Sequence, residues 1–240
     1  MINKILIIIP TYNEKRNVNI LVKKIFKVVK KKFDILFIDD NSPDDTALEI
    51  KKLKKIKKNI ILISRSKKKG IGSAHKAGLR WGYKKKYPCI ITMDCDGTHD
   101  PIFIKKMIPK LKHSDLVITN RFINKNSLDT WPLYRKMLTY FRHYIIFIIL
   151  NMSYDSSGAF RCYDTKKVKY KDLALAKNEG YSFFWESIFI LSKKNYRISE
   201  IPIRLPNRIV GGTKMRLRDI FFAFCYLINI FLKNLIGKIN

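Results

Sequence analysis

The chain has 240 residues, of which 47% are apolar, so it is long enough to bury one sizeable hydrophobic core, and we expect one domain. Lys and Arg total 49 against 19 Asp and Glu. The resulting net charge of +30 favours partners that carry phosphate, such as nucleotides, nucleic acids or anionic lipids. The sequence contains no helix-turn-helix, zinc-finger or RNA-recognition signature, which argues against a nucleic-acid-binding module.

Cysteine usage and the start of the chain indicate a reducing compartment. The cysteines form no CxxC pair and show no metal-ligand spacing, so we expect neither a disulfide framework nor a zinc site. They are Cys89, Cys95, Cys162 and Cys225. An apolar segment begins at Ile5 with no small-residue cleavage site after it, so we expect no secretory signal and a cytosolic catalytic part.

Five short apolar segments recur in the first half of the chain, with helical patterns between them. They are residues 5–9, 35–38, 60–63, 89–93 and 116–119. Segments of this kind are typical of strands that are buried on both faces. In the first two intervening helices we expect Leu21, Ile25 and Val29, and then Leu53 and Ile56, to face inward. The alternation predicts an α/β fold with a mostly parallel sheet, in which ligands bind beyond the carboxyl ends of the strands.

The strand-helix alternation ends after about Leu128. Residues 144–150 are wholly apolar, and residues 220–236 are apolar with three polar interruptions. A membrane-spanning helix needs about 20 predominantly apolar residues, so we expect interfacial or core helices in both places. We therefore predict a catalytic domain over residues 1–215 and a hydrophobic, membrane-associated helix over residues 216–240.

The strongest chemical signal is Asp94-Cys95-Asp96, which follows the fourth predicted strand. Two carboxylates separated by one residue in an extended segment point the same way and can share one cation. Oxygen ligands favour Mg²⁺ or Mn²⁺, which characteristically bridge carboxylates to substrate phosphates. The alternative is an acidic turn that caps a helix starting near Pro101.

Two further polar segments follow predicted strands. In the acidic segment 39–45 we expect Asp40 to lie at the ligand site, and Ser42 or Asp44 to cap the next helix. After the first strand, Tyr12 offers a ring to stack on a base and Glu14 offers a carboxylate to accept from ribose or base donors. The glycine-containing segment 70–78 follows the third strand, so we interpret it as a tight turn and helix start instead of a dinucleotide fingerprint.

Arginines form the remaining set of candidates. A guanidinium pairs phosphate in a bidentate manner and does not deprotonate, which suits diphosphate and lipid-phosphate binding, although an exposed solubilising role is an equal alternative for each. The candidates are Arg121, Arg135, Arg161, Arg204 and Arg208. The histidines show no metal-binding spacing, and we expect structural or surface roles for His75, His99, His113 and His143.

Taken together and in order, these segments resemble the family-2 inverting glycosyltransferases, in particular the dolichyl-phosphate mannosyltransferase branch. The resemblance runs from about Ile5 to Met215. It rests on residues 10–14, 39–45, 69–75, 94–101, 157–163, 180–183 with Glu186, 200–203 and 208–215. It implies a nucleotide-sugar-binding fold of the GT-A type.

The resemblance also implies roles for individual positions. The nucleotide would be held by Pro10, Tyr12, Glu14, Ile38 and Asp40, and the donor by Asp94, Cys95 and Asp96. Asp96 and Thr98 would complete a site for Mg²⁺ or Mn²⁺. Arg121 would lie near the reacting phosphates, Arg135 would receive the lipid phosphate, and Arg208 with Lys214 would close over the donor diphosphate. Ser156, Ser157 and Gly158 would lie beside the acceptor.

The activity implied is inverting transfer of a hexose, mannose from GDP-mannose being favoured, to dolichyl or polyprenyl phosphate at the cytosolic face of a membrane. UDP-glucose as the donor for the same lipid, transfer to a glycan or lipopolysaccharide precursor, and a metal-free structural relative are the alternatives. Departures from the family pattern occur at Gly97-Thr98, Asn120 and Phe184-Trp185, and they bear on the donor sugar and the metal geometry.

We expect the membrane-facing side to consist of residues 131–150 and 217–236, because a lipid acceptor requires a surface that combines apolar anchors with basic residues. A small membrane-protein partner for the last helix is the alternative. The expected interfacial aromatic residues are Trp131, Tyr134, Tyr140, Phe141 and Tyr144. The expected headgroup contacts are Arg135, Lys136, Arg142, Arg216 and Arg218.

Overall fold

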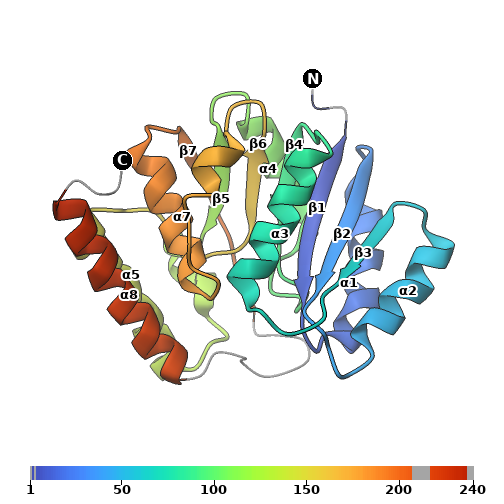
Figure 1. The fold of residues 1–240 in the computed structure, drawn as a ribbon, viewed down its shortest axis with the longest axis horizontal. Coiled ribbons are helices and arrows are strands. Elements are labelled where there is room, and N and C mark those ends of the chain that lie inside the picture. Colours follow the sequence, from blue (N-terminus) through green and yellow to red (C-terminus); the bar gives the residue numbers. More distant parts are fainter. Residues whose placement is uncertain (1, 3, 207–216, 237–240) are drawn as a thin grey trace.

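A seven-stranded sheet forms the centre of the molecule (Figure 1). The structure, a computed structural model, describes residues 2, 4–206 and 217–236. Along the sheet the strands lie in the order β3-β2-β1-β4-β6-β5-β7. Their bounds are β1 Ile5–Thr11, β2 Phe33–Asp39, β3 Ile60–Ser64, β4 Cys89–Thr92, β5 Leu116–Asn120, β6 Arg161–Asp164 and β7 Ile198–Pro202.

The five predicted strands are confirmed as β1 to β5, and the sheet is mostly parallel as expected. The strand β6 is the exception, because it runs antiparallel to both of its neighbours, β4 and β5. Neither β6 nor β7 was predicted. The cysteines expected to be reduced are free, although the sulfur atoms of Cys89 and Cys162 lie 3.6 Å apart across the β4–β6 pair.

Helices cover both faces of the sheet (Figure 1). Alternate residues of β1 divide between the two cores: Ile7 packs with residues of α1, α2 and α4, whereas Ile8 packs with residues of α3, α5, α7 and α8. The helices are α1 Lys15–Val28, α2 Thr46–Ile56, α3 Ile71–Lys84, α4 Ile104–Lys110, α5 Leu133–Leu150, α6 Tyr170–Leu173, α7 Ser182–Lys193 and α8 Leu217–Leu235. The described residues also form two 3₁₀ helices, η1 Pro101–Phe103 and η2 Lys125–Leu128.

Most of the expected inner helix positions are buried, with one error. Leu21 and Ile25 of α1 are buried, but Ile56 of α2 is 75% exposed and the buried position of that helix is Ile50. The physical reason is the helical repeat of about 3.6 residues, which places a residue six positions after Ile50 well off the inner face. The expected inward orientation of Ile56 is therefore wrong.

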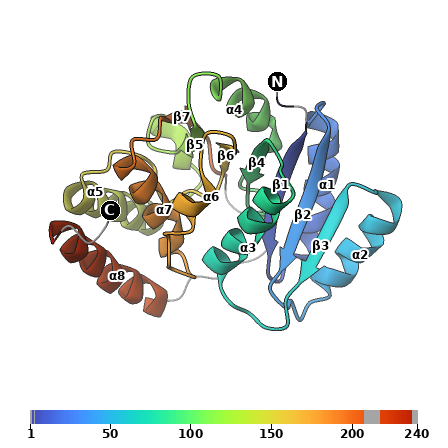
Figure 2. The same ribbon diagram turned by 45° about the horizontal axis from the view of Figure 1, so that its top comes forward.

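The helices α5 and α8 lie side by side at one end of the molecule, and α2 lies at the other end (Figures 1 and 2). Both helices carry a buried side toward the core, with Ile146 and Leu150 on α5 and Leu227 and Ile230 on α8. No helix within the described residues is long and apolar enough to cross a membrane.

The helix α3 approaches β1 closely because it has glycine at the contact. A Cβ atom at Gly78 would lie 2.5 Å from Cγ2 of Ile8, which is fully buried on β1. One turn later, a Cβ at Gly82 would lie 2.7 Å from Leu6 and 2.6 Å from Ile90. The distance between α3 and the sheet therefore depends on these two glycines, and α3 begins at the edge of the functional site.

We predict that Gly78→Ala lowers the free energy of unfolding by about 1–3 kcal/mol, because the methyl group overpacks a contact that cannot relax. The higher helix propensity of alanine, about 1 kcal/mol at an open position, offsets only part of this cost. Urea denaturation followed by circular dichroism measures the change. Arg80→Ala on the exposed side of the same helix is the control, and an unchanged or higher unfolding free energy for Gly78→Ala would contradict the packing.

Candidate functional site

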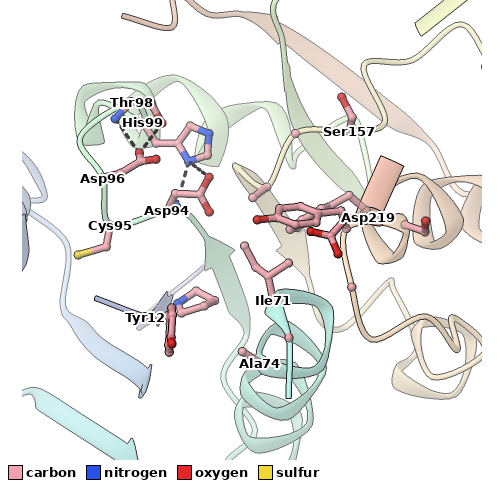
Figure 3. A pocket seen from close by; sticks show the side chains of 18 of the residues that line it. Tyr12, Ile71, Ala74, Asp94, Cys95, Asp96, Thr98, His99, Ser157 and Asp219 are labelled. Atoms are coloured by element: carbon pink, nitrogen blue, oxygen red, sulfur yellow. Dashed lines mark hydrogen bonds and ion pairs between the residues drawn. The ribbon is translucent and has the colours of Figure 1, made fainter. Parts of the chain in front are cut away.

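One cavity of about 490 Å³ opens beyond the carboxyl ends of β1, β2 and β4 (Figure 3). Twelve of the residues predicted for the site line it: Pro10, Tyr12, Glu14, Asp40, Asp94, Cys95, Asp96, Thr98, Arg121, Arg135, Ser157 and Gly158. Ile38 does not line the cavity because its side chain is fully buried in the core. Ser156 is buried too, and it is also absent from the cavity lining. Arg208 and Lys214 lie outside the described residues.

The proposed base-binding end of the cavity is formed by the loop after β1. The ammonium of Lys68 lies 3.8 Å from the centroid of the Tyr12 ring, a cation–π contact that occupies one face of the ring. The carboxylate of Glu14 accepts a hydrogen bond of 2.6 Å from the side-chain amide of Asn17. A base would therefore stack on the second face of Tyr12 or displace Lys68.

The carboxylate of Asp40 joins β2 to the segment that precedes α3. It accepts hydrogen bonds from the backbone N–H groups of Lys69 and Gly70, at 2.9 Å each to Oδ2, and it forms an ion pair of 3.2 Å with Arg65. Gly70 has a φ of 96°, and a Cβ there would lie 2.6 Å from the carbonyl oxygen of Glu179, so only glycine fits. Asp40 thus holds the rim of the cavity as well as lining it.

Of the two residues expected as alternative caps of α2, Asp44 bonds to the first residue of the helix and Ser42 does not. Ser42 donates to Asp39 at 2.6 Å and accepts from the backbone N–H of Asn13 at 3.0 Å, so it ties the loops after β1 and β2 together. Asp44 accepts from the backbone N–H of Thr46 at 3.1 Å but lies one residue before the N-cap position. Ser42 as a helix cap is wrong, because its hydroxyl is used between loops.

The acidic segment after β4 is a bent loop, in contrast to the extended segment expected. The strand ends at Thr92, and Gly97 has a φ of 81°. Asp96 accepts through Oδ1 from the backbone N–H and the hydroxyl of Thr98, at 3.1 and 2.7 Å (Figure 3). Two residues of the predicted metal site are therefore held in one turn.

A histidine expected to be structural lies within this loop. Nδ1 of His99 accepts a hydrogen bond of 2.9 Å from the backbone N–H of Asp94, and it lies 3.7 Å from the Asp94 carboxylate (Figure 3). The bond to Asp94 is a structural role, as expected, but His99 also lines the cavity. His75, in contrast, is buried against Phe183 and Phe184, where burial, followed by the charges of Arg161 and His99, lowers its pKa to about 3.

The donor atoms of this loop fit a hard divalent cation. Two carboxylates and a hydroxyl, from Asp94, Asp96 and Thr98, supply only oxygen, which suits Mg²⁺ or Mn²⁺. Within the described part of the chain no group of three or more His, Cys, Asp or Glu residues could hold a metal ion. Among the described residues the cavity therefore offers few ligands, and substrate phosphate oxygens would be suitable additional ones.

The opposite end of the cavity is basic and depends on one buried carboxylate. Asp155 accepts through Oδ2 from the backbone N–H and Nε of Arg121, at 3.0 and 2.7 Å. Burial acts to raise the pKa of Asp155, but the charge of Arg121, its two hydrogen bonds and the charge of Arg142 together lower it below its ordinary value. Asp155 is therefore ionised, and it fixes Arg121 at the end of β5.

The buried guanidinium of Arg161 fixes the loop that includes Ser157 and Gly158. This guanidinium is 1% exposed, and it donates to the carbonyl oxygens of Gly158 at 2.9 Å and of Ser156 and Phe184 at 2.8 and 2.6 Å. Arg161 therefore shapes the loop but does not line the cavity. Ser156 contributes through this carbonyl and not through its side chain.

Two expectations about membrane-facing residues are wrong. Trp131 is only 8% exposed, and its ring packs under the guanidinium of Arg135 at 3.5 Å, so it belongs to the core and the cavity wall. Arg142 turns inward and donates to the hydroxyl of Ser157 at 2.9 Å. The sequence placed both in an aromatic, basic segment. Trp131 lies just before α5 and Arg142 lies within it, and only tertiary packing decides which of their side chains turn to the cavity.

The helix α8 also reaches the cavity, which the sequence did not indicate. Arg218, Asp219 and Ala223 line it, and Figure 3 shows Asp219 at the cavity. The sequence also did not place four other lining residues at the cavity, namely Lys68, His99, Arg142 and Tyr181, and it did not predict Asp155, which binds Arg121. Asp155 was the easiest of them to predict from the sequence, because it lies directly before the predicted acceptor loop.

Comparison with known sequences identifies the family. Residues 6–194 match the model named Glycosyl transferase family 2. The chain is 30% identical over 213 residues to the undecaprenyl-phosphate mannosyltransferase of Micrococcus luteus, a match that covers 88% of this chain and 87% of that protein. It is 28% identical over 213 residues to the polyprenol monophosphomannose synthase of Mycolicibacterium smegmatis, covering 88% of this chain and 80% of that protein.

Comparison with solved structures agrees with the fold. Glucosyl-3-phosphoglycerate synthase from Mycobacterium tuberculosis, crystallised with Mn²⁺, uridine diphosphate and glucosyl-3-phosphoglycerate, matches with a TM-score of 0.61 at 16% identity, over 97% of this chain and 79% of that chain. S. aureus TarS in complex with UDP-GlcNAc matches with a TM-score of 0.61 at 18% identity, over 96% and 67%. These likenesses confirm the expected GT-A type fold. With the family match over most of its length, the chain is a glycosyltransferase that belongs to glycosyl transferase family 2.

Proposed function

We propose that this protein transfers mannose from GDP-mannose to dolichyl or another polyprenyl phosphate, at the cytosolic face of a membrane. The observation that carries the proposal is the division of charge within one cavity. Asp94 and Asp96 lie on one side of the cavity, and Ser157 lies on the other (Figure 3). On that second side Arg142 donates to Ser157 and Arg121 lies against Gly158, so the guanidinium groups outnumber the carboxylate of Asp219. An acidic end suits a cation with the donor diphosphate, and a basic end suits an anionic acceptor. The names of the two sequence relatives support a polyprenyl-phosphate acceptor and a mannose donor.

The reaction is a single displacement. An oxygen of the lipid phosphate bonds to the anomeric carbon as the bond from that carbon to the donor diphosphate breaks. The bonding electrons leave with the diphosphate, and the configuration inverts. The attacking phosphate is already anionic at neutral pH, so no side chain needs to remove a proton. The contribution of the protein is therefore positioning and charge stabilisation, with Arg121 and Arg135 at the reacting phosphates.

We infer that Asp94, Asp96 and Thr98 would hold Mg²⁺ or Mn²⁺, which when bound would neutralise charge on the leaving diphosphate. Support comes from the oxygen-only donor set and from the related fold that was crystallised with Mn²⁺ and uridine diphosphate. Pro10, Tyr12, Glu14 and Asp40 would surround the nucleoside, and Arg208 with Lys214 would close over the diphosphate. Ser157 and Gly158 would lie beside the acceptor.

The membrane-facing side proposed is the outer surface of α5 and α8. On α5, Tyr134 and Phe141 are 68% and 63% exposed, and on α8, Phe221 and Phe222 are 64% and 60% exposed. Such apolar and aromatic side chains beside basic residues suit the interface of a bilayer. In this proposal residues 1–215 belong to the catalytic domain. Within residues 216–240, the helix α8 associates with the membrane from the cytosolic side.

The proposed activity is tested by a matrix of donors and acceptors read by mass spectrometry. GDP-mannose, UDP-glucose and UDP-GlcNAc are each offered with undecaprenyl phosphate, dolichyl phosphate and a glycan acceptor. The expected result is mannosyl-phosphate-lipid from GDP-mannose alone. Product formed from UDP-glucose with the same lipids would show that UDP-glucose is a donor. Transfer only to the glycan would reject the lipid-phosphate acceptor.

We predict that Asp96→Asn lowers kcat/KM on the order of 100-fold, because the amide keeps the shape but loses the charge that a hard cation requires. Binding of Mn²⁺ with guanosine diphosphate, followed by electron paramagnetic resonance, should weaken in parallel. The matched control is Asp100→Asn in the same loop, where an exposed side chain caps η1 through the backbone N–H of Ile102. Near-normal turnover of Asp96→Asn at saturating metal would reject the proposed metal site.

Changing Phe221, Phe222 and Phe224 together to Ser should release the protein from anionic liposomes. Activity on full-length lipid should fall, while activity on a short-chain soluble acceptor survives, because the cavity is unchanged. The control is Leu48→Ser with Ile56→Ser on α2, which removes two exposed apolar side chains at the opposite end of the molecule. Equal loss on both acceptors with a lower melting temperature would place the three phenylalanines in the core, and retained liposome binding would favour a membrane-protein partner.

A further inference from the structure

Arg142 is a cation at the cavity without an anion of its own. Its Nη2 donates to the Ser157 hydroxyl at 2.9 Å, and it forms no ion pair within 4.0 Å with any acidic side chain of the described residues. The remaining segments, 207–216 and 237–240, contain no Asp or Glu. Arg142 is partly buried. Withdrawing a charge from water without an ion-pair partner is costly, and an anionic ligand would compensate that cost.

The surroundings of Arg142 increase this cost. Both oxygens of Asp155 are already engaged, Oδ2 by Arg121 and Oδ1 by the Ser157 hydroxyl at 3.2 Å. Burial and then the charge of Arg121 lower the pKa of Arg142 to about 10, and Asp155 offsets only part of the effect. One carboxylate therefore serves two guanidinium groups, and the pair has an excess of positive charge at neutral pH.

We propose that Arg142, together with Arg121, binds the phosphate monoester of the acceptor, and that it selects a dianionic headgroup over an alcohol. This inference rests on the proposed function and assigns a further residue to its acceptor site. A phosphate monoester carries about −1.5 to −2 charges at neutral pH, which two guanidinium groups match. A planar guanidinium also meets two phosphate oxygens at once, which an ammonium does not.

The position of Arg142 favours the acceptor over the donor diphosphate. In Figure 3 its hydrogen-bond partner Ser157 and the proposed metal ligand Asp96 lie on opposite sides of the cavity, with Asp94 and His99 between them. Arg142 lies on α5 directly after Phe141, which is 63% exposed on the apolar outer surface of that helix. A phosphate at Arg142 would therefore leave its hydrocarbon chain near the proposed membrane-facing side.

The test compares binding of geranyl monophosphate and geraniol to the full-length protein, through the fluorescence of Trp131 and Trp185 in the cavity wall. Arg142→Gln should raise the Kd of the monophosphate about 10-fold or more and leave the Kd of the alcohol unchanged. Arg142→Lys keeps the charge but not the planar group, so its Kd for the monophosphate should lie between those of the wild type and Arg142→Gln. Arg80→Gln on the exposed side of α3 should match the wild type.

Two further measurements distinguish phosphate binding by Arg142 from a structural role in which Arg142 only holds the loop at Ser157. Binding of guanosine diphosphate with Mg²⁺ and the melting temperature without ligand should not change in Arg142→Gln, whereas the acceptor KM should rise more than kcat falls. An unchanged monophosphate Kd, or an equal loss for guanosine diphosphate, would overturn the inference. Absence of transfer in the wild type, together with the predicted loss of monophosphate binding, would instead reject the proposed function and leave the phosphate site standing.

Discussion

The parallel register of β1, β2 and β4 is the constraint on which the site depends. Thr11 pairs with Asp39, and Ile8 pairs with Thr92, so the three strands end at the same edge of the sheet. The chain must leave that edge in loops, where backbone groups are not used by strand pairing and polar side chains can gather. This alignment brings the acidic loop to the cavity, and the turn at Gly97 with the bonds of Thr98 and His99 sets its shape. Burial of both faces of the sheet therefore leaves the polar side chains of the site in the loops at this edge.

The basic end has a different origin, because it depends on the reversal at β6. This strand runs antiparallel between β4 and β5, so the loop before it, which contains Asp155, lies beside the carboxyl end of β5. Asp155 can then bind Arg121 and also donate its backbone N–H to Glu200 at 3.0 Å. Burial, with the nearby charge of Asp155, raises the pKa of Glu200 in spite of its hydrogen bonds. The charge division in the cavity therefore reflects strand direction.

The predictable parts of the molecule are those specified by local pattern. Apolar runs identified β1 to β5, and residues that follow parallel strands, such as Asp40 and Asp96, were expected at the cavity. The strand β6 was missed because its sequence, Arg-Cys-Tyr-Asp, contains no apolar run. Arg142 was assigned to the membrane side because composition cannot show which way a helix faces. Its inward contact with Ser157 joins positions 15 residues apart and is decided by tertiary packing.

A chain of hydrogen bonds connects the outer helix to the rim of the cavity. The hydroxyl of Tyr226 on α8 donates to Glu186 at 2.7 Å, and the same carboxylate accepts from the backbone N–H of Asn178 at 2.9 Å. The adjoining carbonyl oxygen of Glu179 accepts from the backbone N–H of Ser73 at 2.9 Å, in the first turn of α3. Since Glu186 is 2% exposed, losing one partner would leave buried polar groups unsatisfied. If α8 lies on a bilayer as proposed, these contacts fix the depth of the cavity relative to the lipid headgroups.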